Sequence, residues 1–204
     1  QFWGRRIRYR ETKDVLDEMQ ILKEEYGATA IVIDDDNFLV DKKRVSLILE
    51  GMIERKLDLK WIYGSGSMVK IIDKDDKFLD LLIRSGYAYF NLAIESSSDV
   101  TLKRIKKPLE IHHAVSLINK LRDRYPHMYV NAFFIVGFPF ESTEDIQNTL
   151  QFSENLELDW ATHQIYFSYP NTELFDYSVD NNFIERLNLN PGEIYNPEEI
   201  SGDD

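Results

Sequence analysis

Ala28-Thr29-Ala30-Ile31-Val32-Ile33 runs directly into Asp34-Asp35-Asp36, so a short apolar stretch ends in three adjacent carboxylates. Four of the six residues in the stretch are β-branched, which predicts a strand that is covered on both faces. Such strands belong to parallel sheets, in which helices connect one strand to the next. Ligands of these folds collect at the carboxyl ends of the strands, where the carboxylates stand. The segment therefore predicts an α/β fold and marks one part of its site.

The same pattern of a strand ending in polar residues recurs along the chain, and a helix-period segment follows almost every copy. Strands are predicted at 28–33, 59–63, 87–94, 128–136 and 159–168, and helices from Thr12 to 26 and at 41–56, 75–85, 111–125 and 142–156, with a short helix through Leu102 and Ile105 and a last one after Thr172. Parallel crossovers are right-handed in nearly all cases, so the strands should lie in sequence order and curl toward a full or partial barrel. An open doubly wound sheet is the alternative, although no Gly-x-Gly-x-x-Gly loop follows any strand.

Length and composition describe one acidic globular domain. The chain has 204 residues, of which 43% are apolar, and it carries a formal net charge of −12, which disfavours binding to nucleic-acid backbones. Its longest apolar run, at 132–136, is too short to span a membrane. The sequence contains no cysteine, which excludes disulfides and thiolate metal sites and agrees with a cytoplasmic protein. We expect a barrel domain over 1–190 and an irregular acidic tail over 191–204.

The acidic triplet Asp34, Asp35 and Asp36 is a candidate cation site. Alternation along an extended chain points the first and third carboxylates to one side. Two unpaired carboxylates about 4 Å apart repel by roughly 4 kcal/mol at an effective dielectric of about 20, so the cluster favours an ammonium group, a metal or hydrogen-bond donors. A solvated loop is the alternative, and the triplet alone favours that alternative. No histidine and carboxylate spacing in the sequence indicates a zinc site.

Two other strand ends carry candidate binding residues. Glu95-Ser96 follows a long apolar strand, and a carboxylate there can accept hydrogen bonds from both hydroxyls of a ribose; a helix N-cap formed by the neighbouring serines is the equal alternative. In Gly137-Phe138-Pro139-Phe140-Glu141, the glycine permits close backbone approach and the proline fixes a turn that can receive a flat ring. A plain strand-to-helix turn explains the same residues.

Taken together, these clusters resemble the radical S-adenosylmethionine (SAM) superfamily, in the subgroup whose members often carry a cobalamin-binding domain upstream. The resemblance covers roughly residues 2–176. It is carried by Phe2-Trp3-Gly4-Arg5-Arg6 with Arg8-Tyr9-Arg10, Tyr26-Gly27, Asp35-Asp36-Asn37-Phe38, Ile94-Glu95-Ser96 with Leu102 and Lys106-Lys107, Phe134 through Ser142, and Tyr169 through Phe175.

The resemblance implies a fold, a set of cofactors and a role for each strand end. The fold would be strands two to six of a six-stranded partial TIM-like (β/α) barrel. Asp34, Asp35 and Asp36 would contact the amino group of SAM, Glu95 and Ser96 its ribose or methionine part, and Ile135, Gly137 and Glu141 its adenine. The intact protein would use SAM and a [4Fe–4S] cluster, cleaving SAM reductively to a 5′-deoxyadenosyl radical; cobalamin-dependent methyl transfer is one of the reactions it allows.

Departures from the family pattern qualify what the resemblance implies. The family's first strand is followed by a loop with three cysteines that hold the cluster, and no residue here can supply them. We therefore expect the C-terminal part of a radical SAM enzyme, inactive as given and with no cofactor bound. Phe140 stands where the resemblance implies glycine, which puts the geometry of the adenine-side turn in doubt. Asn171 also replaces a glycine, but this change is mild because asparagine tolerates positive φ.

The sequence leaves two alternative functions open and predicts few binding partners. A non-catalytic nucleotide- or partner-binding barrel is the alternative function, and an unrelated phosphate-binding barrel enzyme is a third. The substrate is a small or unknown molecule, and neither nucleic acid nor a membrane span is expected. Without a first strand, the strand at 28–33 has a free apolar edge, which is prone to pairing. We expect residues 1–10, the C-terminal tail or a second copy of the chain to cover it.

Overall fold

The computed structural model describes residues 8–35, 37–64 and 69–184. In that part of the chain the strands are β1 (Ala30–Ile33), β2 (Lys60–Tyr63), β3 (Tyr89–Glu95), β4 (Tyr129–Val136) and β5 (Trp160–Ile165). The helices are α1 (Thr12–Glu24), α2 (Lys42–Glu54), α3 (Val69–Asp73), α4 (Asp76–Arg84), α5 (Asp99–Arg104), α6 (Ile111–Arg124), α7 (Thr143–Asn155) and α8 (Glu173–Asp180), with a 3₁₀ turn η1 (Phe38–Val40). Strands and helices alternate along the chain, as predicted.

The strands are parallel and lie in sequence order. β1 pairs with β2, while β3, β4 and β5 form a second ladder, in the order β3-β4-β5. The two ladders touch through a parallel bridge between Trp61 and Tyr87, where Trp61 N donates to Gly86 O at 3.1 Å and Ala88 N donates to Trp61 O at 2.9 Å. β2 and β3 are therefore joined only near the amino end of β3. This arrangement confirms the predicted partial (β/α) barrel and rules out the doubly wound alternative, whose strand order would not be sequential.

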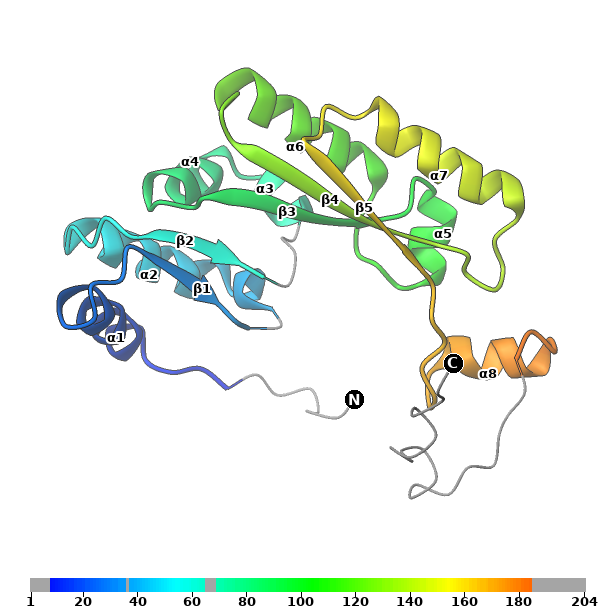
Figure 1. Ribbon diagram of the computed structural model, residues 1–204, viewed down its shortest axis with the longest axis horizontal. Coiled ribbons are helices and arrows are strands. Elements are labelled where there is room, and N and C mark those ends of the chain that lie inside the picture. Colours follow the sequence, from blue (N-terminus) through cyan, green and yellow to red (C-terminus); the bar gives the residue numbers. More distant parts are fainter. Residues whose placement is uncertain (1–7, 36, 65–68, 185–204) are drawn as a thin grey trace, which may run out of the picture.

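The helices cover one face of the strands and leave the other face open. Figure 1 shows α4, α6 and α7 over β3–β5, and α2 against β1 and β2, whereas α8 lies apart, beyond the carboxyl end of β5. The helix-facing residues of β3, Phe90, Leu92 and Ile94, are fully buried, as are Leu117 and Leu121 of α6. One continuous hydrophobic cluster extends from α1 to β4. The core therefore lies between the strands and the helical layer.

Several predicted boundaries are corrected by the structure. Thr12 is the first residue of α1 rather than its N-cap, which is Glu11 and makes no side-chain capping bond. The strands are shorter than predicted, above all β5, which stops at Ile165. The helix α3 and the turn η1 were not predicted, because both are too short to show a helical period. The N-cap of α6, Glu110, likewise makes no side-chain capping bond, whereas Ser142 and Asp145 form a reciprocal capping box at α7.

The edge of β1 that faces away from β2 is unpaired within the described residues. Val32 on this strand is 63% exposed, although the residue is β-branched and apolar. Of the predicted covering segments, Tyr9 lies against Arg44 and Arg10 pairs with Glu18, so neither contacts β1 through these interactions. Residues 1–7 and the tail over 191–204 lie outside the described residues. Covering of this edge, including self-association through 28–33, stays a prediction.

Lys56 closes the end of α2 in a conformation that lysine disfavours. Leu57 N donates to Met52 O and Lys56 N to Ile53 O, both at 3.0 Å, which is the bonding pattern of a Schellman cap. Lys56 has φ +52° in this cap, where glycine is the usual residue. We expect Lys56→Gly to raise the free energy of unfolding by roughly 0.5–1 kcal/mol, because the steric cost of a left-handed lysine exceeds the added chain entropy of glycine.

Urea denaturation of Lys56→Gly beside Lys56→Ala measures this effect. Alanine removes the same side chain but keeps the Cβ strain, so its midpoint should not rise. An equal gain in both variants would show that the lysine side chain, and not its backbone conformation, is unfavourable.

Candidate functional site

A groove of about 790 Å³ opens at the carboxyl ends of β3, β4 and β5. Its size is that of a typical cofactor or ligand site, and its position is the one at which barrel folds bind ligands. The lining combines apolar and aromatic side chains with three charged ones. It consists of Glu95, Ile105, Lys106, Lys107, Pro108, Ile135, Phe138, Gln164, Ile165, Tyr166, Phe167 and Tyr169. Of the residues that the resemblance assigns to the SAM site, Glu95 and Ile135 thus line one groove.

The turn after β4 is organised by the carboxylate of Glu141. Gly137 N and Phe138 N both donate to Glu141 Oε2, at 2.9 and 3.0 Å. Gly137 has φ +81°, a conformation that favours glycine, so the chain can double back beneath the groove. Burial raises the pKa of Glu141, the nearby charge of Asp145 adds to the effect, and the two backbone donors and the Thr101 hydroxyl oppose it. Gly137 and Glu141 therefore build the turn whose Phe138 lines the groove.

Glu95 enters the groove from a strained backbone. The ladder between β3 and β4 shifts register between Ala93 and Glu95, and Glu95 has φ +74° although it is not glycine. Such a conformation costs of order 1–3 kcal/mol and clusters at functional sites. Its carboxylate accepts a hydrogen bond from Lys107 Nζ at 2.9 Å, within a largely buried ion pair. The strand end thus presents a carboxylate to the groove with its charge balanced by one lysine.

Ser96 points away from the groove and fastens the strand end to α7. Its side chain is fully buried, with Oγ 3.5 Å from Thr149 Oγ1, and it accepts a hydrogen bond from Ser98 N at 3.2 Å. Ser98, in turn, caps α5 by accepting from Thr101 N at 3.2 Å. Ser98 is therefore an N-cap, that of α5. Ser96 anchors the strand end next to Glu95 to α7.

Phe140 and Asn171, the two positions at which glycine is replaced, each have a structural explanation. Asn171 has φ +64°, the conformation that its glycine counterpart would adopt, and Thr172 beside it caps α8 by accepting from Phe175 N at 3.2 Å. Phe140 leaves the turn intact, because its ring stacks on that of Phe138 at a centroid distance of 5.6 Å and does not line the groove. The turn thus forms with Phe140 stacked on Phe138 and outside the groove.

Asp34 and Asp35 do not line this groove. Asp34 and Asp35 are exposed at the end of β1, and Asp35 Oδ1 accepts a hydrogen bond from Asn37 N at 2.8 Å within a local turn. Asp36 lies outside the described residues. In the part of the chain that the structure describes, no group of three or more histidine and acidic residues could hold a metal ion. The solvated-loop interpretation therefore fits Asp34 and Asp35 as placed.

The sequence interpretation missed the residues at the end of β5 and just after it that complete the groove. Gln164, Tyr166, Phe167 and Tyr169 form this wall, and the last two are exposed aromatic rings whose centroids lie 5.3 Å apart. The signal was available, because three aromatic residues within four positions follow the polar centre of the strand. The ion pair between Lys107 and Glu95 joins residues twelve positions apart, and no sequence pattern predicts it.

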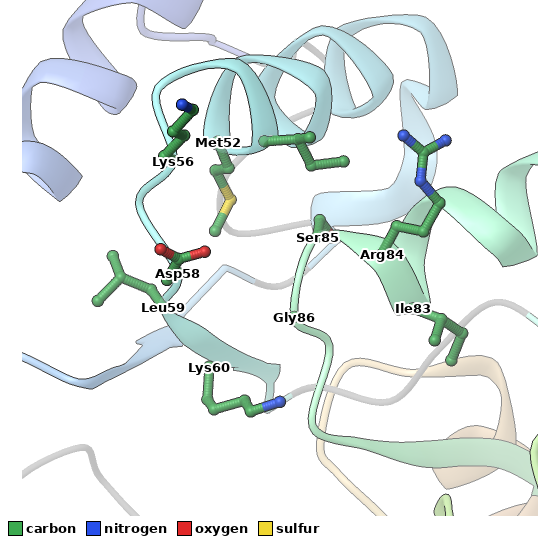
Figure 2. A pocket seen from close by; sticks show the side chains of 10 residues that line it. Met52, Lys56, Asp58, Leu59, Lys60, Ile83, Arg84, Ser85 and Gly86 are labelled. Atoms are coloured by element: carbon green, nitrogen blue, oxygen red, sulfur yellow. The ribbon is translucent and has the colours of Figure 1, made fainter.

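A second, smaller groove of about 300 Å³ lies at the opposite ends of the strands. Figure 2 shows Lys56 and Arg84 reaching out from the ends of α2 and α4, with Asp58 and Lys60 on the segment that enters β2. Helix carboxyl ends carry partial negative charge, which favours the lysine and arginine found there and opposes a bound anion. Lys56 and Arg84 therefore stabilise the carboxyl ends of α2 and α4. This groove is not a second candidate binding site.

The fold and the first groove define a class of protein: a parallel (β/α) partial barrel with a cofactor-sized site at the carboxyl ends of its strands. The profile of the radical SAM superfamily matches residues 1–153. The chain belongs to the radical SAM superfamily. Within the described residues, no helix is both long enough and apolar enough to cross a membrane.

Relatives and solved structures agree with this family. The chain is 28% identical over 186 residues to an uncharacterised methyltransferase of Pyrococcus horikoshii, which covers 91% of this chain and 39% of the relative. It is 30% identical over 191 residues to cytidylyl-2-hydroxyethylphosphonate methyltransferase of Streptomyces wedmorensis, covering 90% of this chain and 35% of the relative. The fold matches coproporphyrinogen III oxidase of Escherichia coli, a radical SAM enzyme, with a TM-score of 0.58 at 14% identity over 95% of this chain and 44% of the other. The chain spans little more than a third of the length of these two methyltransferases.

Proposed function

We propose that this chain forms the SAM-binding part of a radical SAM enzyme, with the cofactor held in the groove at the carboxyl ends of β3–β5. The observation that carries the proposal is the convergence of Glu95, Ile135 and the Glu141-braced turn on one cofactor-sized groove. These residues come from separate strand ends, and family membership supports their joint use. The Asp34, Asp35 and Asp36 segment would supply a further wall for the SAM amino group.

Each part of the groove suits one part of SAM. The Glu95 carboxylate can accept hydrogen bonds from ribose hydroxyls, with Lys107 holding it in place. Ile135 and Phe138 offer apolar surface to the adenine ring, and Gly137 removes any side chain from the turn below. Bound SAM would supply the radical precursor for the reaction, while these residues orient it and exclude water.

The iron–sulfur cluster that the family uses does not fit the residues of this chain. The sequence has no cysteine, so thiolate ligands would have to come from elsewhere in a longer protein. On this basis we propose that the chain alone is inactive. A Cys-x-x-x-Cys-x-x-Cys spacing in the preceding coding sequence is the expected finding. Its absence would favour the rival proposal of a non-catalytic nucleotide- or partner-binding barrel.

Methyl transfer is the reaction that we propose for the intact protein. Both reported sequence relatives are named methyltransferases, and they align over about 90% of this chain. Cobalamin dependence belongs to the same proposal and rests on the resemblance of the sequence to the cobalamin-binding subgroup. Cytoplasmic placement is likewise proposed, supported by the lack of cysteine and the reducing conditions that iron–sulfur chemistry needs.

The chain should bind SAM measurably but weakly. Chelation of the SAM amino and carboxylate groups by iron is missing, so we expect a Kd of roughly 1 mM, about −4 kcal/mol, by titration followed with NMR. Glu95→Gln should weaken this binding about tenfold, because it removes the charged acceptor for the ribose hydroxyls. Glu144→Gln, an exposed neighbour on α7, is the matched control and should bind as the wild type does.

Two results would contradict this assignment of the groove. One is tight binding, below about 1 μM, since the groove residues alone cannot replace the missing chelation. The other is binding that is equally strong in Glu95→Gln and in the wild type, which would place SAM elsewhere on the chain.

A further inference from the structure

The aromatic wall of the groove is formed by Phe138, whose own position depends on other rings. Phe138 is almost fully buried and contacts Tyr166 across the groove wall at a centroid distance of 5.0 Å. On the turn itself, the ring of Phe140 lies parallel to that of Phe138, with 5° between the planes. The Glu141 carboxylate holds the backbone of this turn by accepting from Gly137 N and Phe138 N. The orientation of the Phe138 ring is set by its contacts with Tyr166 and Phe140.

Arg104 holds the far end of this ring series. Its guanidinium carbon lies 3.9 Å from the ring centroid of Phe140 and 5.0 Å from that of Tyr177 on α8. Phe140 and Tyr177 also meet edge to face at 6.5 Å. A guanidinium over two aromatic faces is attracted by both rings, at about 0.5–1 kcal/mol for an exposed site. Residues from α5, the turn after β4 and α8 thus converge on one cation.

We infer that Arg104 is a positioning residue for the adenine side of the groove, acting through Phe140 on the ring of Phe138; the inference rests on the proposed function. Phe140 is the link, because its ring contacts both the Arg104 guanidinium and the ring of Phe138. The ring series therefore joins α5 to the groove.

The nearby salt bridge between Lys106 and Glu173 does not hold the ring series. Lys106 Nζ lies 2.6 Å from Glu173 at the start of α8, and both side chains are largely exposed. Such an exposed pair contributes little and is screened by salt. Cation–π contacts weaken less, because the aromatic rings exclude part of the solvent. Of these two cations, Arg104 is therefore the one that supports the Phe140 ring, on a turn whose backbone Glu141 holds.

The experiment titrates 5′-deoxyadenosine into the chain and follows the adenine H2 and H8 resonances by NMR. A ring stacked near Phe138 should shift both protons upfield at saturation. We expect Arg104→Ala to weaken binding about three- to fivefold and to reduce the upfield shifts extrapolated to saturation, because Phe138 samples more orientations. Arg104→Lys should retain most of both effects, since an ammonium group also binds aromatic faces. Lys103→Ala, a neighbouring exposed cation on α5, should match the wild type.

The outcomes separate the positioning role from the proposed function and from simple structural support. Wild-type binding with upfield shifts unchanged in Arg104→Ala would overturn the inference and leave the proposed function standing. A lower melting temperature in Arg104→Ala, with the same Kd and the same saturated shifts, would also overturn it by assigning a structural role only. Wild type that does not bind 5′-deoxyadenosine at all would overturn both the inference and the proposed function.

Discussion

Gly86→Ala is expected to destabilise the fold by about 2–5 kcal/mol, one of the two largest single-residue effects in this chain. Gly86 has φ +98°, which L-residues rarely adopt. An added Cβ would lie closer than 3.0 Å to the backbone carbonyl oxygen of Leu59. That carbonyl cannot move freely, because Leu59 is buried and the following residues are bonded to Thr29 and to Gly86 itself. Backbone strain and steric clash therefore add.

The site of the clash explains why its effect reaches the whole sheet. Gly86 O accepts from Trp61 N at 3.1 Å, in the bridge that joins β2 to β3. Moving Gly86 to relieve the clash would break the contact between the two ladders. Urea denaturation should show a lower midpoint with an unchanged slope.

Gly27→Ala provides the matched control. Gly27 also has positive φ, at +68°, but nothing lies within 4 Å of its added Cβ, so only the strain of about 1–2 kcal/mol remains. Equal losses in the two variants would show that the close approach to Leu59 O is unimportant.

The sequence predicted the repeating architecture because that information is local. The apolar run at 28–33 and its counterparts identify strands, and handedness rules place them in order. The tolerance of Asn171 for positive φ is local as well, and Asn171 has φ +64°. The exact first residue of a helix is harder to predict: Thr12 has a capping side chain but stands one position after the N-cap, Glu11.

The site was less predictable because it depends on side-chain directions between distant segments. Ser96 and Glu95 are neighbours, yet one faces α7 and the other the groove, since the register shift before Glu95 turns the chain. The sequence suggested that Phe140 would disturb the turn after β4. Its packing against Phe138 and Arg104 instead keeps its side chain out of the groove. The aromatic residues after β5 line the groove because of the barrel's curvature, which no short pattern encodes.

Glu141→Ala is expected to lower the free energy of unfolding by about 2–4 kcal/mol and to abolish detectable binding of SAM. The carboxylate accepts from Gly137 N and Phe138 N, and each hydrogen bond to a charged group contributes about 1.5–3 kcal/mol, part of which water recovers. Without that acceptor the turn is free to open, and Phe138 leaves the groove wall. Chemical denaturation and ligand titration measure the two effects, with Glu144→Ala as the control.

Glu141→Gln separates the hydrogen bonds from the charge. Both backbone donors meet the same oxygen, Oε2, so the single carbonyl oxygen of glutamine can accept both. The amide nitrogen would take the place of Oε1, which is buried and has no hydrogen-bond partner among the described residues, so no bond is lost there. We therefore expect Glu141→Gln to retain most of the stability and the binding that alanine loses. A glutamine variant as unstable as the alanine variant would show that the negative charge itself holds the turn.

The raised pKa of Glu141 fixes the sign of its pH dependence. Burial, reinforced by the charge of Asp145, makes the folded chain hold the Glu141 proton more tightly than the unfolded chain does. The stabilising contribution of protonated Glu141 is therefore fully present below the ordinary pKa of glutamate and is lost as pH rises through the raised value. Glutamine cannot titrate, so the difference in unfolding free energy between Glu141→Gln and wild type should shift in favour of glutamine across that window and stay constant above it. A difference that moves toward the wild type with rising pH would mean that the backbone donors outweigh burial and that the pKa is lowered instead.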